Sequence, residues 1–267
     1  MRFGVSLPNF GSGVDAAAVA EWARAAEAAG WDGLFLWDHL FAFAEGPVET
    51  VDPWIALTAA AYATTTIRLG TLVTPLPRRR PVVVARQTAS LDRLSGGRLV
   101  LGVGSGAFPF EWDYLGEETD PRVRGEMLDE HLGLLDRLWT GEQVRHEGAH
   151  YRVAGPDWGG LCWPPPVQQP RIPVWVAARW PNRRPLRRAL KWDGVFPIDL
   201  PGPDALAELA AAIRAERDGP FDVVVTNPAG EDVRPWVAAG ATWCLTGFGN
   251  DPREDEVRAA IEAGPAA

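Results

Sequence analysis

Short apolar segments alternate with amphipathic helical segments along the whole chain, and this alternation limits the possible folds more than any other feature. Buried parallel strands appear as continuous apolar runs, whereas helices repeat their apolar residues with a period near 3.6. We expect strands over residues 3–7, 33–37, 68–73, 99–103, 173–177, 193–198, 221–226 and 241–246. We expect helices over residues 15–29, 53–63, 82–94, 122–139, 185–191, 203–217, 231–238 and 253–263. This order predicts an α/β fold of the closed (β/α)8 TIM-barrel type rather than an open sheet.

The chain length favours a single domain. Its 267 residues match one TIM barrel, so we expect one barrel domain over residues 1–267. A longer segment, about residues 105–172, separates the fourth and fifth strands and includes the proline-rich run at 163–166. Because it has no strand or helix pattern large enough for a second domain, we interpret it as an insertion in one barrel loop.

The composition excludes several classes of protein. The net charge of −9 argues against a general affinity for nucleic acid, and no apolar run approaches the length of a membrane span. The first residues lack the regions of a signal peptide, so a cytoplasmic location is expected. Cys162 and Cys244 show no metal-ligand spacing, and we expect no metal site. The basic run Arg78–Arg80 is interpreted as a solvated loop rather than an anion site.

Polar residues and glycines follow the apolar strands, and in a TIM barrel the function lies at the carboxyl ends of the strands. The residues selected by this rule are Pro8, Asn9, Asp38, His39, Thr74, Pro75, Ser105, Gly106, Arg179, Trp180, Asp199 and Gly247.

His39 is the first catalytic candidate, because an imidazole at a strand end suits acid–base chemistry near neutral pH. The alternative is a histidine that only caps the strand through backbone hydrogen bonds. We expect the other histidines, at positions 131, 146 and 150, to lie on the surface.

Two further features suit a phosphate-bearing ligand. The glycines around Ser105 and Gly106 allow close approach to the backbone, although close packing at the barrel rim explains them equally well. This segment matches neither the dinucleotide fingerprint nor a P-loop. Arg179 and the basic helix start after it favour an anion site, with surface salt bridges as the alternative.

A series of short motifs runs in a fixed order along nearly the whole chain. They are FGVSLPN at 3–9, AAGWDGLFLWDH at 28–39, DPW at 52–54, IRLGTLVTP at 67–75, DRLSGGR at 92–98, LWTG at 138–141, QQPRIPVWVA at 168–177 and WDG at 192–194. Their order and spacing resemble the bacterial luciferase-like family of flavin- and coenzyme F420-dependent oxidoreductases.

The resemblance implies a barrel that binds the ring of FMN or of the deazaflavin F420 at its strand ends. It implies a non-prolyl cis peptide in a bulge at Leu72-Val73, against which the ring lies, with Asp38 and His39 near the reactive centre. The residues implied to bind the cofactor are Asn9, Leu72, Val73, Thr74, Ser105, Gly106, Ala177, Ala178, Arg179 and Trp180.

One position departs from the family pattern. Sugar-phosphate dehydrogenases of the family carry a glutamate acid just after the glycine strand end, where this chain has Ala107. Glu111 follows four residues later and is the candidate replacement. The departure argues against a sugar-phosphate substrate.

The resemblance favours hydride transfer or oxygenation of a small organic molecule, and leaves open whether the cofactor is F420 or FMN. Two alternatives stay open: a non-catalytic flavin-binding barrel, and a metal- or Schiff-base-dependent barrel lyase or hydrolase. The lack of paired histidines and of a suitably placed lysine argues against the second. Family members often form dimers, so we also expect a homodimer.

Overall fold

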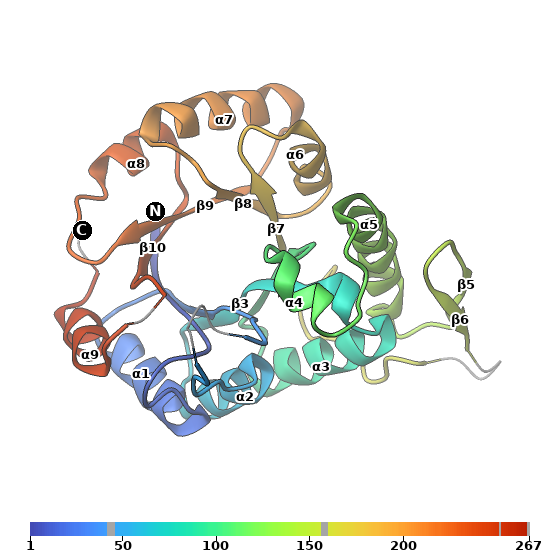
Figure 1. Ribbon diagram of the computed structural model, residues 1–267, viewed down its shortest axis with the longest axis horizontal. Helices are drawn as coiled ribbons and strands as arrows, with labels where there is room; N and C mark the ends of the chain where they lie inside the picture. Colours follow the sequence, from blue (N-terminus) through green and yellow to red (C-terminus); the bar gives the residue numbers. More distant parts are fainter. Residues whose placement is uncertain (42–45, 156–159, 251, 266–267) are drawn as a thin grey trace.

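The computed structural model describes residues 1–41, 46–155, 160–250 and 252–265. Parallel strands close into a barrel in the order β1-β10-β9-β8-β7-β4-β3-β2, and helices surround it (Figure 1). The barrel strands are β1 Arg2–Leu7, β2 Gly33–Leu36, β3 Arg68–Pro75, β4 Leu99–Gly104, β7 Val174–Arg179, β8 Gly194–Ile198, β9 Asp222–Pro228 and β10 Trp243–Gly247. The (β/α)8 barrel expected from the alternation is therefore confirmed.

Helices follow the strands in the ring, and several of them begin at an Asp side-chain cap or with a proline in the first turn. They are α1 Ala16–Ala28, α2 Pro53–Ala63, α3 Pro81–Leu94, α5 Pro121–Leu138, α6 Arg183–Ala189, α7 Pro203–Glu216, α8 Arg234–Ala239 and α9 Glu254–Ala263. The Asp15 carboxylate caps α1 by accepting from the Ala18 amide at 2.8 Å, and Gly30 follows the helix with a φ of 86°. These local signals explain why most helix bounds agree with the expected ones within two residues.

The segment expected as an insertion contains one helix of the ring. Helix α5 lies between α3 and α6 in the outer ring, and it contacts α3 (Figure 1). The remaining elements between β4 and β7 are the short helix α4 Pro109–Asp113 and a hairpin of β5 Arg145–Glu147 and β6 Arg152–Ala154. The hairpin lies outside the ring, whereas α4, which follows β4 in the chain, lies inside the ring of helices (Figure 1).

Apolar side chains fill the middle of the barrel. Phe35, Trp175 and Trp243 pack with ring centroids 5.1–5.7 Å apart. Leu72, Val100, Val224 and Leu245 belong to the same buried cluster. The barrel is therefore a packed core, as in other TIM barrels, and room for a ligand exists only toward its ends.

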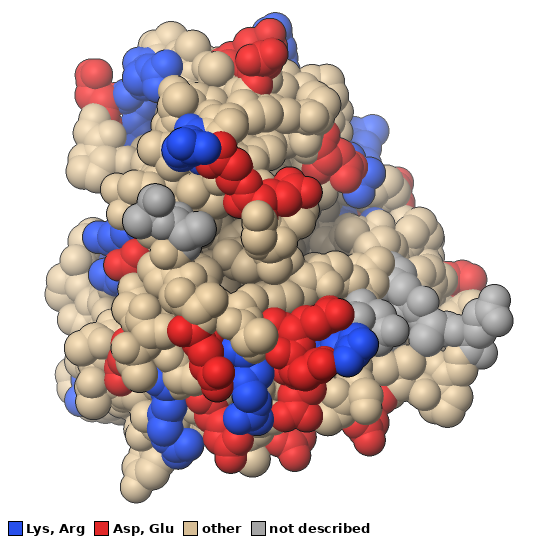
Figure 2. Space-filling view, turned by 90° about the vertical axis from the view of Figure 1, so that its left-hand side faces the viewer, with Lys and Arg blue, Asp and Glu red and all other residues tan. Residues whose placement is uncertain are grey.

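The surface carries both signs of charge. Figure 2 shows carboxylates on both sides of a hollow, with Lys and Arg side chains between them. This face therefore has no basic patch of the kind that nucleic acid requires. Within the described part of the chain, no helix combines the length and apolar character needed to cross a bilayer.

Candidate functional site

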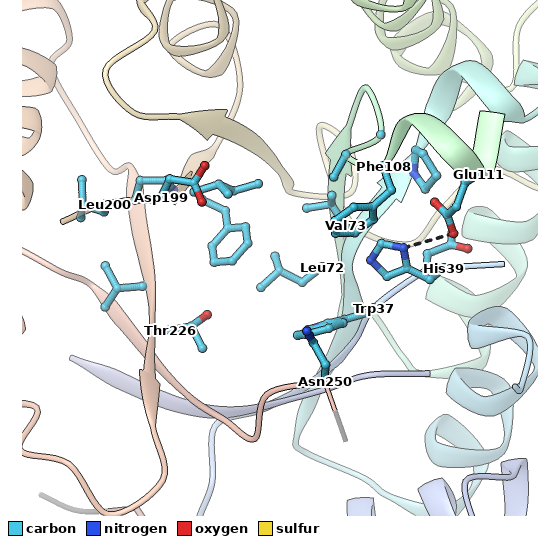
Figure 3. A pocket seen from close by; sticks show the side chains of 18 of the residues that line it. Trp37, His39, Leu72, Val73, Phe108, Glu111, Asp199, Leu200, Thr226 and Asn250 are labelled. Carbon is cyan, nitrogen blue, oxygen red and sulfur yellow. Dashed lines mark hydrogen bonds and ion pairs between the residues drawn. The ribbon is translucent and has the colours of Figure 1, made fainter. Parts of the chain in front are cut away.

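A cavity of about 440 Å³ opens where the strands end, and its two walls come from different halves of the chain (Figure 3). One wall follows β2, β3 and β4, and its members include Trp37, His39, Leu72, Val73, Phe108 and Glu111. The opposite wall follows β8 and β9 and is mostly apolar, with Phe196, Ile198, Leu200, Val225 and Trp236. A concave, largely apolar site with few polar groups is typical of cofactor and small-ligand pockets.

His39 and Glu111 form the polar centre of the first wall. Nδ1 of His39 lies 3.2 Å from Oε1 of Glu111, and the opposite edge of the imidazole faces the cavity (Figure 3). The Phe108 ring lies beside the imidazole, with centroids 5.1 Å apart. A carboxylate that accepts from one ring nitrogen fixes the orientation of the imidazole and favours the proton on that nitrogen.

Glu111 is held as an acceptor. Its Oε1 also accepts from the backbone amides of Leu40 at 2.9 Å and Phe41 at 3.3 Å. Burial raises the pKa of Glu111, but the His39 hydrogen bond and charge, the Leu40 amide and the Arg78 charge outweigh it, so the net pKa is lowered. Glu111 is therefore a carboxylate at neutral pH, which suits orienting His39 better than supplying a proton in place of the acid missing at Ala107.

The short helix α4 brings Glu111 to His39, and Trp112 fixes this helix. Trp112 is buried, and the guanidinium of Arg78 lies 4.3 Å from its ring centroid and that of Arg124 4.5 Å. Gly106 has a φ of 86°, and a Cβ there would lie 2.0 Å from the Trp112 ring. Gly106 thus lines the cavity because only glycine fits above Trp112.

The expectation that Arg78–Arg80 form a solvated loop is wrong for two of the three residues. Arg78 pairs with Glu117 at 2.9 Å and with Glu111 at 3.7 Å, and its side chain is only 7% exposed. Arg79 binds both oxygens of Asp38 at 2.8 Å. These arginines fold inward because the strand ends present buried carboxylates, whereas Arg80 is exposed.

Asp38, expected beside His39 as a second catalytic residue, lines the cavity, but its carboxylate accepts hydrogen bonds from other side chains of this protein. Besides Arg79, the hydroxyl of Thr74 donates to its Oδ2 at 2.8 Å. Thr74 is itself fully buried and does not line the cavity, although we expected it to contact the cofactor. In the structure this pair ties the end of β2 to the end of β3, and a catalytic role of Asp38 stays a prediction.

The bulge expected at the end of β3 is present. The peptide bond between Leu72 and Val73 is cis, and the pairing register with β4 shifts between Thr71 and Thr74. Leu72 and Val73 both line the cavity on the side of His39 that faces away from Glu111 (Figure 3). The surface expected for a flat ring is thus part of this wall.

Asn9, expected to contact the cofactor, lies outside the cavity wall and is fully buried. Its Oδ1 accepts from the His39 amide at 3.0 Å, and its Nδ2 donates to the carbonyls of His39 and Val51, each at 2.9 Å. Asn9 is therefore a residue that positions the backbone of His39. Ser105 also lies outside the wall, and its carbonyl accepts from Arg124 at 3.0 Å.

The end of β7 does not line the cavity. Ala178 is buried in the apolar cluster that joins the strands to the surrounding helices, and Trp180 packs against the same cluster. A cofactor contact of either residue stays a prediction. Ala177 is partly exposed, and the side chain of Arg179 is 56% exposed and pairs with Asp199 at 3.0 Å. Asp199 does line the cavity, so Arg179 lies at the rim.

Sequence reasoning missed most of the wall that follows β8 and β9. The apolar residues there read like any buried strand, because strand patterns do not separate core positions from cavity positions. Trp37 and Phe108 on the first wall were also missed, although Trp37 precedes Asp38 and Phe108 lies two residues after Gly106. Across the described ranges no group of His, Cys, Asp or Glu is arranged to hold a metal ion.

Comparison with known proteins gives relatives over most of the chain. A sequence model described as luciferase-like monooxygenase matches residues 1–230. An uncharacterized protein of Mycobacterium tuberculosis is 34% identical over 223 residues, which cover 80% of this chain and 75% of that protein. The F420-dependent hydroxymycolic acid dehydrogenase of the same organism is 29% identical over 250 residues, covering 91% of this chain and 68% of that protein.

Two solved structures share the fold at low identity. An F420-dependent secondary alcohol dehydrogenase, in complex with an F420–acetone adduct, has a TM-score of 0.81 and 17% identity, covering 98% of this chain and 96% of that chain. The oxygenating constituent of 3,6-diketocamphane monooxygenase from Pseudomonas putida, in complex with FMN, has a TM-score of 0.69 and 22% identity, covering 85% and 67%. The family match, together with the relative that is 34% identical, identifies this chain as a member of the luciferase-like monooxygenase family.

Proposed function

We propose that this chain is an oxidoreductase that binds F420 or FMN in the cavity and transfers hydride between that cofactor and a small uncharged alcohol or carbonyl compound. One observation carries the proposal: the His39–Glu111 pair faces the same space as the Leu72-Val73 bulge. An oriented proton acceptor beside a flat apolar surface is what hydride transfer from an alcohol requires.

The residues present fit a flat tricyclic ring. Leu72 and Val73 form one apolar surface, and Phe196 and Val225 belong to the opposite one. A phosphate group on the cofactor would be bound at the rim, where Arg179 is exposed. Relatives with F420 or FMN in their names or structures support both cofactors, and the choice between them stays open.

When bound, the cofactor supplies the hydride acceptor or donor. During oxidation of an alcohol, Nε2 of His39 takes the hydroxyl proton as the hydride leaves the carbon, and the product is a carbonyl compound. Glu111 keeps Nδ1 of His39 as the donor, so the imidazole accepts at its other nitrogen. The surrounding aromatic side chains, Trp37 and Phe108, exclude water from this proton transfer.

The charge of the cavity selects against anionic substrates. Among the described residues that line it, the acidic ones are Asp38, Glu111 and Asp199, and none is Lys or Arg. The arginines behind these carboxylates are already paired with them: Arg79 with Asp38, Arg78 with Glu111 and Arg179 with Asp199. A phosphate or carboxylate on the substrate would meet these carboxylates and pay a desolvation cost without a cationic partner. The opposite wall is apolar, so we propose a neutral substrate with an aliphatic or aromatic body.

The test begins with fluorescence titrations of the pure protein with F420 and with FMN. The cofactor that binds is then mixed, without oxygen, with a panel of neutral alcohols, matched sugar phosphates and hydroxy acids. We expect the cofactor to be reduced by neutral alcohols and not by the anionic set. Binding without turnover over the whole panel would instead support the non-catalytic flavin-binding alternative, and reduction by sugar phosphates would overturn the substrate class.

Oxygenation is the second candidate reaction, because the family is named for monooxygenases and one structural neighbour is an oxygenating enzyme with FMN. Oxygen consumption by the protein with reduced FMN and a neutral ketone separates the two reactions. Oxygen uptake coupled to product formation would favour oxygenation over hydride transfer.

We also propose a homodimer that uses the outer face of α2 and α3. A groove of about 340 Å³ lies between these helices, and the buried Trp54 Nε1 and Gln87 Oε1 have no hydrogen-bond partner among the described residues. Exposed apolar side chains on the two helices are Ile55, Tyr62, Val83 and Leu94. A second copy is the occupant that we propose, because a face with both a groove and projecting apolar groups is self-complementary about a two-fold axis.

Light scattering after size exclusion tests this dimer. We expect the wild type to have twice the monomer mass and the double variant Ile55→Glu/Leu94→Glu to be a folded monomer. A monomeric wild type would contradict the dimer and leave the cofactor proposal untouched.

A further inference from the structure

Arg78 is a buried cation at the back of the His39–Glu111 pair. Its Nε donates to Oε2 of Glu117 at 2.9 Å, and its guanidinium lies over the Trp112 ring. These contacts hold the guanidinium away from the cavity, and Arg78 is not one of the cavity-lining residues. Its two terminal nitrogens are buried and have no hydrogen-bond partner in the described part of the chain.

The two oxygens of Glu111 have different partners. Oε1 takes the hydrogen bonds from His39, Leu40 and Phe41. Oε2 faces Nη1 of Arg78 at 3.7 Å, and this ion pair is its only partner among the residues that the structure describes. Removal of the Arg78 charge would therefore leave a buried carboxylate oxygen without a cation, which favours protonation of Glu111.

A protonated Glu111 would no longer determine which ring nitrogen of His39 carries the proton. A carboxylate only accepts hydrogen bonds, so it requires a proton on Nδ1 of His39. A carboxylic acid can also donate, so either ring nitrogen of His39 can then carry the proton. The nitrogen that faces the cavity would lose its fixed role as an acceptor.

We propose that Arg78 is a positioning residue, which keeps Glu111 ionised and thereby fixes His39 in the tautomer with Nδ1 protonated and Nε2 directed at the cavity. The catalytic consequence rests on the proposed function, whereas the tautomer does not. Other charges near the pair are balanced: Glu117 pairs with Arg78, and Asp38 pairs with Arg79. Arg124 lies against Trp112 and donates to the backbone carbonyls of Ser105, Glu118 and Thr119.

The direct test is nitrogen-15 NMR of the histidine rings in the cofactor-free protein at neutral pH. We compare the wild type with Arg78→Met, which keeps an unbranched apolar chain beside Trp112 but removes the guanidinium and its charge, and with Arg78→Lys, which keeps the charge. The neighbouring exposed Arg80, as Arg80→Met, is the matched control. Circular dichroism and thermal unfolding check the fold, and Arg78→Gln replaces Arg78→Met if that variant does not fold.

We expect one tautomer of His39, with Nδ1 protonated, in the wild type, in Arg78→Lys and in Arg80→Met. In Arg78→Met we expect a mixture of both tautomers, and the pKa of Glu111, followed by carbon-13 NMR of its carboxyl group, to rise. An unchanged tautomer and an unchanged Glu111 titration in folded Arg78→Met would overturn the proposal.

A double-mutant cycle tests the catalytic consequence. With an active substrate, Arg78→Met should slow cofactor reduction about 10–100-fold. This is the usual effect of losing a residue that orients a functional side chain without contacting the substrate. In the Glu111→Gln background, the same Arg78→Met change should add no further loss, because the carboxylate on which Arg78 acts is gone. Equal losses in both backgrounds would show that Arg78 acts without Glu111. If no substrate is turned over, the proposed function fails, and the NMR experiment still decides the role of Arg78.

Discussion

Asn9 holds the backbone of His39 from both sides, because it accepts from the His39 amide at 3.0 Å and donates to the His39 carbonyl at 2.9 Å. Asn9→Ala removes these bonds and the one to Val51, and leaves buried backbone groups unpaired. We expect a loss of about 2–4 kcal/mol in the free energy of unfolding by urea. The exposed Asn182, as Asn182→Ala, should change stability by less than about 0.5 kcal/mol. An unchanged urea midpoint for Asn9→Ala would contradict the positioning role.

His39→Ala should lower turnover about 10²–10⁴-fold, the usual contribution of general acid–base catalysis. Cofactor affinity, measured by fluorescence titration, should change far less, because contacts with the apolar walls and with the rim of the cavity should account for most of the binding free energy. His39→Asn separates orientation from proton transfer, since an amide forms hydrogen bonds but does not titrate at these pH values.

The control for His39 is His146→Ala, in the hairpin, where the imidazole binds Glu130 at 2.8 Å. Wild-type turnover in His39→Ala would end the catalytic claim. Loss of thermal stability without loss of turnover would favour the strand-capping alternative.

Arg179→Ala should weaken binding of the intact cofactor by about 1.5–3 kcal/mol if its guanidinium binds a phosphate, since this is the scale of a charged hydrogen bond. Affinity for a phosphate-free ring, such as riboflavin or its deaza analogue, should stay nearly the same. Arg187→Ala, an exposed position on α6, serves as the control. Equal loss for both ligands would mean that Arg179 acts on the ring or on folding.

Glu27 gives the protein a pH-dependent stability term. Burial raises the pKa of Glu27. Hydrogen bonds from the amides of Thr66, Ile67 and Thr65 and from the Thr66 hydroxyl outweigh burial, and the net pKa is lowered from 4.5 to about 2. A folded pKa below the unfolded one stabilises the protein above about pH 4.5, and this term is lost as the pH falls toward 2. Because solvent screens Glu27, which is only partly buried, the stabilisation is smaller than the about 3 kcal/mol that the full shift would give.

Glu27→Gln should therefore be less stable than the wild type at pH 7, and the difference should shrink as the pH falls from 4.5 toward 2. Urea unfolding at a series of pH values measures it, with the exposed Glu21→Gln on the same helix as control. A difference between wild type and Glu27→Gln that is constant over this range would contradict the lowered pKa.

The barrel could be predicted from the sequence because its strands are buried on both faces and read as apolar runs. The cavity could be predicted only where a residue type is unusual for its place. His39 stood out as a polar residue after an apolar strand, and Leu72-Val73 followed from the resemblance. The sequence indicates Glu111 as a candidate acid, but its pairing with His39 depends on α4, whose five residues are too few to show a helical period.

Two expectations of exposure failed, one because the partners of the residue lie far away in the chain and the other because the residue lies on the apolar face of its own helix. Arg78 is buried by Glu111, Glu117 and Trp112, which belong to the segment after β4. His131 was expected on the surface, yet it is fully buried in α5 beside Tyr151, and burial lowers its pKa to about 3. Its spacing from Leu128 and Leu135, three and four residues away, placed it on the apolar face of that helix.

The two walls of the cavity are made by segments that are separate in the chain. The proposed proton transfer uses His39 and Glu111, both before residue 112, and the apolar surface opposite to them is supplied by β8, β9 and the loops that follow them. Chemistry and substrate choice can therefore change independently in evolution. Grafting the residues that follow β8 and β9 from a relative should retarget the enzyme to a molecule of another shape, while the inherited histidine and carboxylate continue to work unchanged.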